Sequence, residues 1–136
     1  IITHVTFYSG FPTGVNAARI AAEVFLGKGL PIPAGRFPGA PYLEELIDGL
    51  VLGETWTRDQ LSLRDRSLAT IAVTLAGYQS DQLRAHFSRG LDNGVTTQEI
   101  SELIAHVTLY SGFPTGVNAS KLFVEILQER GIPLPR

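Results

Sequence analysis

The sequence has 136 residues, of which 44% are hydrophobic, 18% are charged and none is cysteine. This composition supports a folded domain with a hydrophobic core, and it excludes disulfides, thiolate metal sites and cysteine-based catalysis. The formal net charge of −2 comes without any run of basic residues, so we expect no nucleic-acid partner. No apolar run reaches the ~20 residues that span a bilayer and no signal peptide is evident, so we expect no membrane partner and a cytoplasmic protein.

One segment occurs twice in the chain. Residues 2–16 read ITHVTFYSGFPTGVN and residues 104–118 read IAHVTLYSGFPTGVN, an offset of 102 residues. The match continues more loosely to a Pro-x-Pro pair, while the apolar positions exchange Ile, Leu, Val, Ala and Phe. Such a repeat indicates a tandem of domains. We therefore predict that residues 1–34 are the C-terminal helical half of a preceding repeat unit, and that residues 35–136 form one complete domain.

The first expected elements are two helices joined by a sharp turn. Residues 1–8 read as the end of a helix, which Gly10 and the nearby Pro12 stop. A second helix should begin at Pro12 or Thr13 and end near Gly27. Residues 29–41 are rich in proline and glycine, which predicts a linker.

The next expected helices precede the second copy of the repeat. An apolar stripe over residues 42–52 predicts a short amphipathic helix, which the following GETWTRDQ should break. Ser62 and Asp65 have the spacing of a capping box and should open a helix over residues 63–77. That helix is nearly all apolar, so we expect it to be central and buried on most sides.

Three more helices complete the expected fold. Ser80 should cap a helix that ends near Leu91, and Thr96 with Glu99 forms a second capping box that opens a helix ending at Tyr110. The repeated turn then leads into a last helix over about 115–130. No segment alternates with a period of two, so the predicted fold class is all-α, a bundle of five or six helices.

Residues 56–114 contain an ordered set of motifs: Trp56-x-Arg58, the LSLRDRSL run at 61–68, Gln82-Leu83-Arg84-x-His86, Asn93-Gly94-Val95-Thr96, Glu99-Ile100-x-Glu102 and Tyr110-x-Gly112-x-Pro114. As an ordered set they resemble a known family. The resemblance is to the carboxymuconolactone decarboxylase family and covers nearly all of residues 42–120. It implies an AhpD-like all-helical fold, tandem-domain members, and self-association into trimers or hexamers. For the namesake it implies loss of carbon dioxide, with no cofactor and no metal, from a small-molecule carboxylate substrate in aromatic compound catabolism.

A sister branch of that family, the AhpD-like alkylhydroperoxidases, uses a Cys-x-x-Cys pair four residues before a histidine. If His86 matches this histidine, the cysteine positions hold Gln79 and Gln82, so thiol peroxidase activity is excluded. We therefore interpret the chain as a carboxy-lyase that acts on a small carboxylated lactone or keto acid. The alternative is a family member that is non-catalytic, or binds another ligand, and whose apolar helices serve assembly.

His86 is the first candidate catalytic residue. It lies at the edge of an apolar helical stripe, one position before Phe87, where an imidazole can relay a proton near neutral pH. The family resemblance favours this role. The alternative is a half-buried histidine that bonds a neighbouring helix.

A second group of candidates projects from the helix that contains the repeat. Glu102, His106 and Tyr110 follow one another at steps of four residues, so they share one side of that helix. A carboxylate one turn from an imidazole raises its basicity and suits a general base. Glu102 and His106 are therefore catalytic candidates and Tyr110 a substrate-binding candidate, and the alternative is a polar network at a helix or subunit interface.

The candidate substrate-binding cation is Arg66. An arginine just before a buried helical run needs a partner anion or must extend to solvent, and a guanidinium grips a carboxylate with two hydrogen bonds. Arg58 is a second candidate for the same role, whereas Arg64 is expected to be a solvated residue of the first helical turn. Trp56 is a candidate substrate wall, or alternatively a domain lid or subunit contact.

Overall fold

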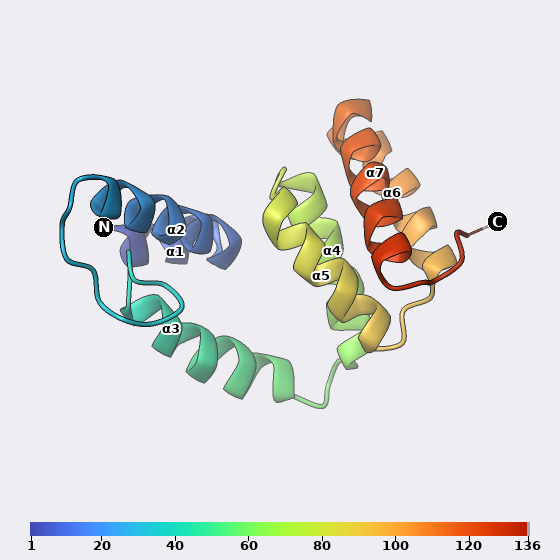
Figure 1. The fold of residues 1–136 in the computed structure, drawn as a ribbon. Coiled ribbons are helices and arrows are strands. Elements are labelled where there is room, and N and C mark those ends of the chain that lie inside the picture. The colour runs from blue at the N-terminus through green and yellow to red at the C-terminus, as the bar shows by residue number, and fades with distance from the viewer. Residues whose placement is uncertain (136) are drawn as a thin grey trace. The chain divides into compact units, whose positions relative to one another are not determined.

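The computed structural model describes residues 1–135, and none of these residues forms a β-strand (Figure 1). The predicted all-α fold class is therefore confirmed. None of the described helices combines the length and hydropathy of a bilayer-spanning segment. The chain forms two compact units, Ile1–Asp59 and Gln60–Arg136, which are described separately. The helices are α1 (Ile2–Ser9), α2 (Phe11–Gly27), α3 (Tyr42–Leu46), α4 (Leu63–Ala76), α5 (Ser80–Asp92), α6 (Thr97–Ser111) and α7 (Phe113–Glu129).

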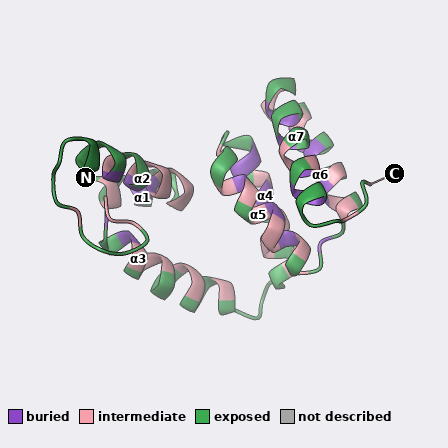
Figure 2. Ribbon diagram, viewed as in Figure 1, coloured by how far each residue is buried: buried purple, intermediate pink, exposed green. Residues whose placement is uncertain are grey.

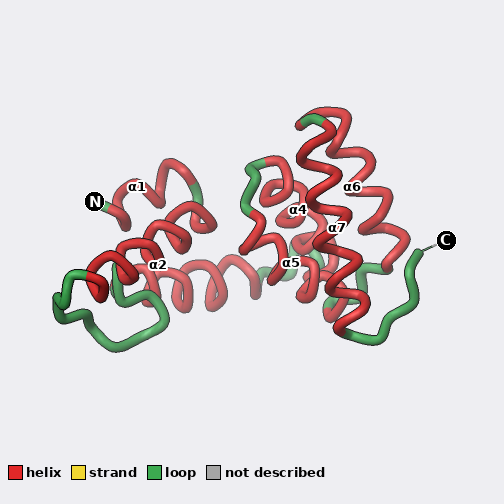
Figure 3. Tube along the Cα trace, turned by 45° about the horizontal axis from the view of Figure 1, so that its top comes forward, coloured by secondary structure: helices red, strands yellow, loops and turns green. Residues whose placement is uncertain are grey.

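The N-terminal unit begins with the predicted pair of helices. Gly10 adopts φ 85° and ψ 156° between α1 and α2, a conformation that favours glycine, and Pro12 occupies the first turn of α2. The second helix thus begins at Phe11, one residue before the predicted start. The predicted linker is confirmed as a non-helical stretch between α2 and α3 (Figure 3). A small core of Ala18, Ala40 and Leu43 holds this unit together.

The predicted break at GETWTRDQ is confirmed, because the helical path ends there and Arg58 is extended, but the stretch before it is not the α-helix that was expected. The chain continues from α3 into a π-helical segment, Ile47–Glu54, and then a 3₁₀ turn, Thr55–Thr57. Gly53 permits this path because a Cβ there would lie 2.7 Å from the carbonyl oxygen of Asp48. The Thr57 hydroxyl donates to the Gly53 carbonyl at 2.9 Å and stabilises the end of the segment.

In the C-terminal unit α4 packs against α5 and α6, and α7 packs against α5 and α6. Both predicted capping sites open their helices. The Ser62 hydroxyl accepts a hydrogen bond from the Asp65 amide at 3.0 Å, and Thr96 and Glu99 form a reciprocal box. The predicted cap at Ser80 was wrong. Ser80 is the first residue of α5, and Gln79 occupies the N-cap position without a side-chain cap bond.

The expectation that α4 is buried on most sides was also wrong. Its buried residues are Ser67, Ile71, Thr74 and Leu75, whereas Val73 is 69% exposed. Figure 2 shows the degree of burial along each helix. The reason for the partial burial of α4 is that the helices packed against it cover only part of its surface. Two of the buried positions, Ser67 and Thr74, are polar and donate to carbonyls one turn earlier in the same helix, so their burial leaves no hydroxyl unsatisfied.

The two copies of the repeat share a turn but differ in burial. Gly112 joins α6 and α7 with φ 93° and ψ 152°, nearly the conformation of Gly10 in the first copy. In the second copy Ile126 and Leu127 belong to the main core and are 1% and 0% exposed. The residues at the same positions of the first copy, Val24 and Phe25, are 48% and 38% exposed. The domain boundary between residues 34 and 35 stays a prediction.

Candidate active site

His86 lies on α5 beside the core. The neighbouring Phe87 is fully buried and directs that face of α5 into the bundle, which leaves the imidazole half-buried with its Nδ1 atom inside the protein. Burial first, and the positive charge of Arg89 second, lower the pKa of His86 from 6.5 to about 4. At neutral pH the imidazole is therefore uncharged.

Arg66 lies on α4, the helix that pairs with α5. Two contacts show that these helices run antiparallel. The Asn93 side-chain amide donates to the Ser67 hydroxyl at 3.0 Å, and Gly90 packs against Ile71. A Cβ on Gly90 would lie 2.9 Å from Ile71 Cδ1, so this contact depends on glycine. Arg66 itself is half-buried and its Nε atom is inside the protein.

Arg64 has a different role from the one expected. The prediction of a solvated first-turn residue was incomplete, because its guanidinium bonds Asp65 at 3.0 Å and also pairs with Glu99. These contacts tie the start of α4 to the start of α6. Hydrogen bonds from Thr96, followed by the charge of Arg64, hold the pKa of the Glu99 carboxyl below its usual value.

The Glu102, His106 and Tyr110 face lies along α6, as the spacing predicts. Glu102 and His106 line one open cavity of about 420 Å³, together with Leu68, Gln98, Glu99 and Leu103. The ring centroids of His106 and Tyr110 are 5.1 Å apart at an interplanar angle of 47°. Because Arg64 pairs with Glu99, the carboxylate of Glu102 is the charge that makes this cavity less favourable for an anionic substrate. Within residues 1–135 no three His, Cys, Asp or Glu side chains gather as metal ligands.

The remaining predicted residues lie in the other compact unit. Trp56 is half-buried in the 3₁₀ turn Thr55–Thr57, and Arg58 follows it in an extended, exposed conformation. His86 and Arg66 therefore share a unit, and so do the α6 candidates, whereas Trp56 and Arg58 belong to the Ile1–Asp59 unit.

Arg89 is a candidate that the sequence interpretation missed. It lies three residues after His86 on α5, is half-buried, and is near enough to lower the imidazole pKa. Positions three residues apart are neighbours on a helix, so this spacing was the signal in the sequence. A positive charge at this place also favours binding of a carboxylate next to His86.

Comparison with known proteins agrees with these observations. A sequence profile of the carboxymuconolactone decarboxylase family matches residues 41–125. The 4-carboxymuconolactone decarboxylase of Acinetobacter baylyi is 40% identical over 89 residues, which cover 65% of this chain and 66% of that protein. Nitrosuccinic acid decarboxylase npaB of Metarhizium robertsii is 33% identical over 76 residues, or 56% of this chain and 53% of that protein. The chain thus spans about half to two thirds of these relatives, and it belongs to the carboxymuconolactone decarboxylase family.

Proposed function

We propose that this chain catalyses the cofactor-free decarboxylation of a small carboxylated lactone or keto acid. Both relatives described above are named decarboxylases, and the profile match includes α4 and α5. The observation that carries the proposal is the half-buried imidazole of His86 beside the positive charge of Arg89. A partly desolvated proton carrier next to a cation is suited to a reaction that begins with a carboxylate and ends with a protonated carbon.

The reaction makes two chemical demands on the site. Cleavage of the bond between the carboxylate and its carbon releases carbon dioxide and leaves an electron pair, which a conjugated carbonyl stabilises as an enolate. One proton must then reach that carbon, so the overall reaction consumes one proton for each carbon dioxide released. In this proposal the imidazolium of His86 donates the proton, and a guanidinium near the carbonyl oxygen stabilises the enolate.

The low pKa of His86 adds a requirement to this mechanism. At pH 7 an imidazole with a pKa of about 4 is uncharged and has no acidic proton of this kind to donate. A substrate carboxylate placed beside it favours the charged form and raises the pKa. Substrate binding should therefore draw a proton from solvent onto His86, and this proton is the one delivered to carbon.

The carboxylate-binding role is assigned to Arg66. Its half-buried guanidinium on α4 and that of Arg89 on α5 provide positive charge on the pair of helices that contains His86. A planar guanidinium binds a carboxylate with two parallel hydrogen bonds. The substrate-binding roles of Arg58 and Trp56, which belong to the Ile1–Asp59 unit, stay predictions from the sequence.

A second arrangement for the same reaction uses α6. Glu102 and His106 line one cavity, and Tyr110 lies beside His106, so a general base, a proton carrier and a hydroxyl are close together. The carboxylate of Glu102 disfavours an anionic substrate there, whereas Arg89 favours one beside His86, which is why His86 is preferred. A role outside catalysis, as an oligomeric family member with another ligand, is favoured by large exposed apolar residues such as Leu109 and Phe113.

The test is direct measurement of carbon dioxide release by the purified full chain. A panel of carboxylated lactones and keto acids is incubated with the wild type, His86→Ala and His106→Ala. We expect His86→Ala to reduce turnover by about 10²-fold or more, the usual contribution of a positioned acid or base. Full turnover in His86→Ala with loss in His106→Ala would transfer the role to the α6 face. No release from any compound would favour the non-catalytic alternative.

A further inference from the structure

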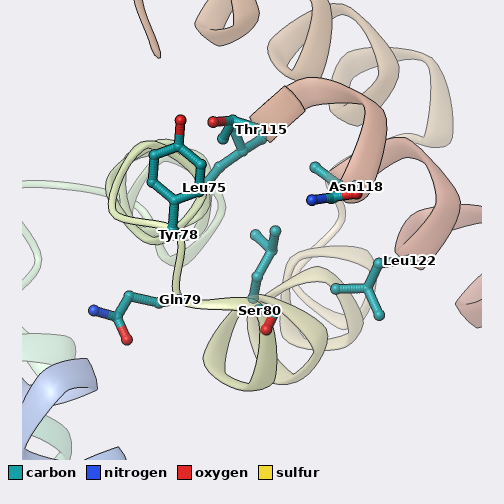
Figure 4. A pocket seen from close by; sticks show the side chains of 9 residues that line it. Leu75, Tyr78, Gln79, Ser80, Thr115, Asn118 and Leu122 are labelled. Carbon is teal, nitrogen blue, oxygen red and sulfur yellow. The ribbon is translucent and has the colours of Figure 1, made fainter. Parts of the chain in front are cut away.

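A cavity of about 180 Å³ lies in the C-terminal unit, between the turn that joins α4 to α5 and the N-terminal half of α7 (Figure 4). None of its lining residues carries a charge, and none is a candidate of the proposed active site. In other proteins an apolar cavity of about 150 Å³ holds one benzene ring, so this space suits a single small ring. The lining residues are Leu75, Tyr78, Gln79, Ser80, Leu83, Thr115, Asn118, Ala119 and Leu122.

The backbone at one wall of this cavity is strained. Tyr78 has φ 56° and is the non-glycine residue with positive φ among residues 1–135. The Tyr78 amide donates to the Leu75 carbonyl at 3.2 Å, and the Gln79 amide donates to the Thr74 carbonyl at 3.0 Å. These two bonds form the Schellman ending of α4, in which glycine usually occupies the left-handed position. A non-glycine residue in this left-handed conformation costs about 1 kcal/mol or more in conformational energy. Tyr78 therefore occupies this wall although the local backbone favours glycine.

The strained tyrosine is held from the other side of the cavity. Its hydroxyl donates to the Ser111 carbonyl at 3.1 Å, and the hydroxyl of Thr115 donates to the same carbonyl at 3.1 Å. Thr115 is buried, whereas Tyr78 is 64% exposed, so the ring forms the outer wall of the cavity. A strained backbone conformation that surrounding contacts maintain, and that lies beside a cavity, is typical of binding sites.

The polar groups of the cavity define what it can bind. Ser80 enters the lining from the start of α5 and Asn118 from α7, while the side chain of Gln79 extends away (Figure 4). Within residues 1–135 neither the Ser80 hydroxyl nor the Asn118 amide bonds another protein group. Together they offer donors and acceptors to one ligand oxygen, against walls formed by Leu75, Leu83 and Leu122. A carboxylate would meet no cation among the lining residues, and the leucine walls would remove part of its hydration.

We propose that this cavity is a second binding site, for an uncharged ring compound with one carbonyl or hydroxyl oxygen. The oxygen bonds the Asn118 amide and the Ser80 hydroxyl, and the ring lies against the leucines and Tyr78. The site is distinct in charge from the proposed active site, which binds carboxylate at Arg66. It does not require that the chain decarboxylates anything.

The experiment uses benzamide and benzoate, which have nearly the same shape and differ in charge. Each compound is titrated into the ¹⁵N-labelled full chain, and amide chemical shifts are followed by NMR. We expect benzamide to shift the amides of Ser80, Leu83, Asn118 and Leu122 saturably, with a dissociation constant in the millimolar range usual for so small a ligand. Benzoate should leave these amides unshifted at the same concentration.

Three variants test the assignment. Asn118→Leu keeps the side-chain size and removes the amide, so benzamide should bind about five- to tenfold more weakly. Leu122→Phe fills the space and should abolish the shifts, with folding checked by circular dichroism. Ser120→Leu on the same helix, outside the lining, is the matched control and should bind as the wild type does. Absence of benzamide binding, equal binding of benzoate, or an equal effect of Ser120→Leu would each overturn the proposal.

Discussion

Thr108 and Gly116 face each other across the α6–α7 turn so closely that a Cβ on residue 116 would collide with the Thr108 hydroxyl. The Thr108 hydroxyl is itself fixed, because it donates to the Ile104 carbonyl at 2.6 Å. Thr6 and Gly14 repeat the contact between α1 and α2. This threonine–glycine pair sets how near the two helices approach in each copy of the repeat.

Gly116→Ala should therefore destabilise the chain. The added methyl group gains helix propensity but forces Thr108 out of its position, and overpacking of this kind costs about 1–3 kcal/mol in the free energy of unfolding. Urea denaturation measures the change. The double variant with Thr108→Ala should recover part of the loss, since the colliding hydroxyl is gone. Gly27→Ala, where nothing lies near the new methyl group, is the control and should not destabilise; a wild-type midpoint for Gly116→Ala would contradict the contact.

The low pKa of His86 predicts how stability depends on pH. The group binds a proton near pH 6.5 in the unfolded chain but only near pH 4 in the folded protein, so the unfolded state binds more protons between these values. The contribution of the uncharged His86 side chain to the free energy of unfolding is fully present above pH 6.5 and is lost as the pH falls through 4. We expect the free energy of unfolding to decrease by about 2 kcal/mol over this range because of His86, after allowance for its partial exposure.

The measurement is a set of urea titrations at pH 4.0, 5.5 and 7.5 on the wild type and His86→Gln. Glutamine does not titrate, so the variant should lack this part of the pH dependence while other groups contribute equally to both proteins. Equal slopes for the two proteins would show that His86 titrates alike in the folded and unfolded states.

Arg66→Lys should act on substrate binding more than on turnover. Lysine keeps the positive charge but cannot form two parallel hydrogen bonds with a carboxylate, so KM should rise about tenfold and kcat should change little. Arg84→Lys is the matched control, because Arg84 pairs with Glu125 and Glu129 on α7. If KM is unchanged in Arg66→Lys and raised in a variant of Arg89, the carboxylate ligand is the residue on α5.

Self-association is expected from the apolar residues that the chain leaves exposed. The first copy of the repeat exposes Val24 and Phe25 at positions that the second copy buries, and α4 exposes Val73. Surface of this kind is usually covered by another chain, and the family resemblance indicates a trimer or hexamer. Light scattering at micromolar concentration should report an oligomer that Val24→Glu weakens and Lys28→Glu does not. A monomeric wild type would contradict this prediction.

The helical fold was predictable because its signals are local. The Thr96 and Glu99 box and the Gly10 and Gly112 turns each depend on residues within one or two helical turns, and all are confirmed. The π-helical segment after α3 was not predicted, since its hydrogen-bond pattern leaves no periodic signature in so short a stretch. The burial of α4 was overestimated because composition does not reveal how many neighbours cover a helix.

The candidate site was predictable as a set of residue types but not as an environment. Spacing alone placed Glu102, His106 and Tyr110 on one face of α6, and two of them share a cavity. Spacing placed His86 at the edge of an apolar stripe, but it could not indicate that the imidazole would be uncharged, because its pKa depends on how α5 packs. Nor could it show Tyr78 in a left-handed conformation, since a glycine stands one position earlier in the sequence.

The shared turn of the two copies also shows which part of the sequence determines the bend between the helices. The first copy packs around Ala18 and Leu43 and the second around Phe87 and Phe123, yet both give glycines of nearly equal dihedral angles. The bend is therefore encoded within its own fifteen residues and needs no particular neighbour. Inserting this segment between two helices of an unrelated protein should therefore reproduce the same bend, with a glycine of the same dihedral angles.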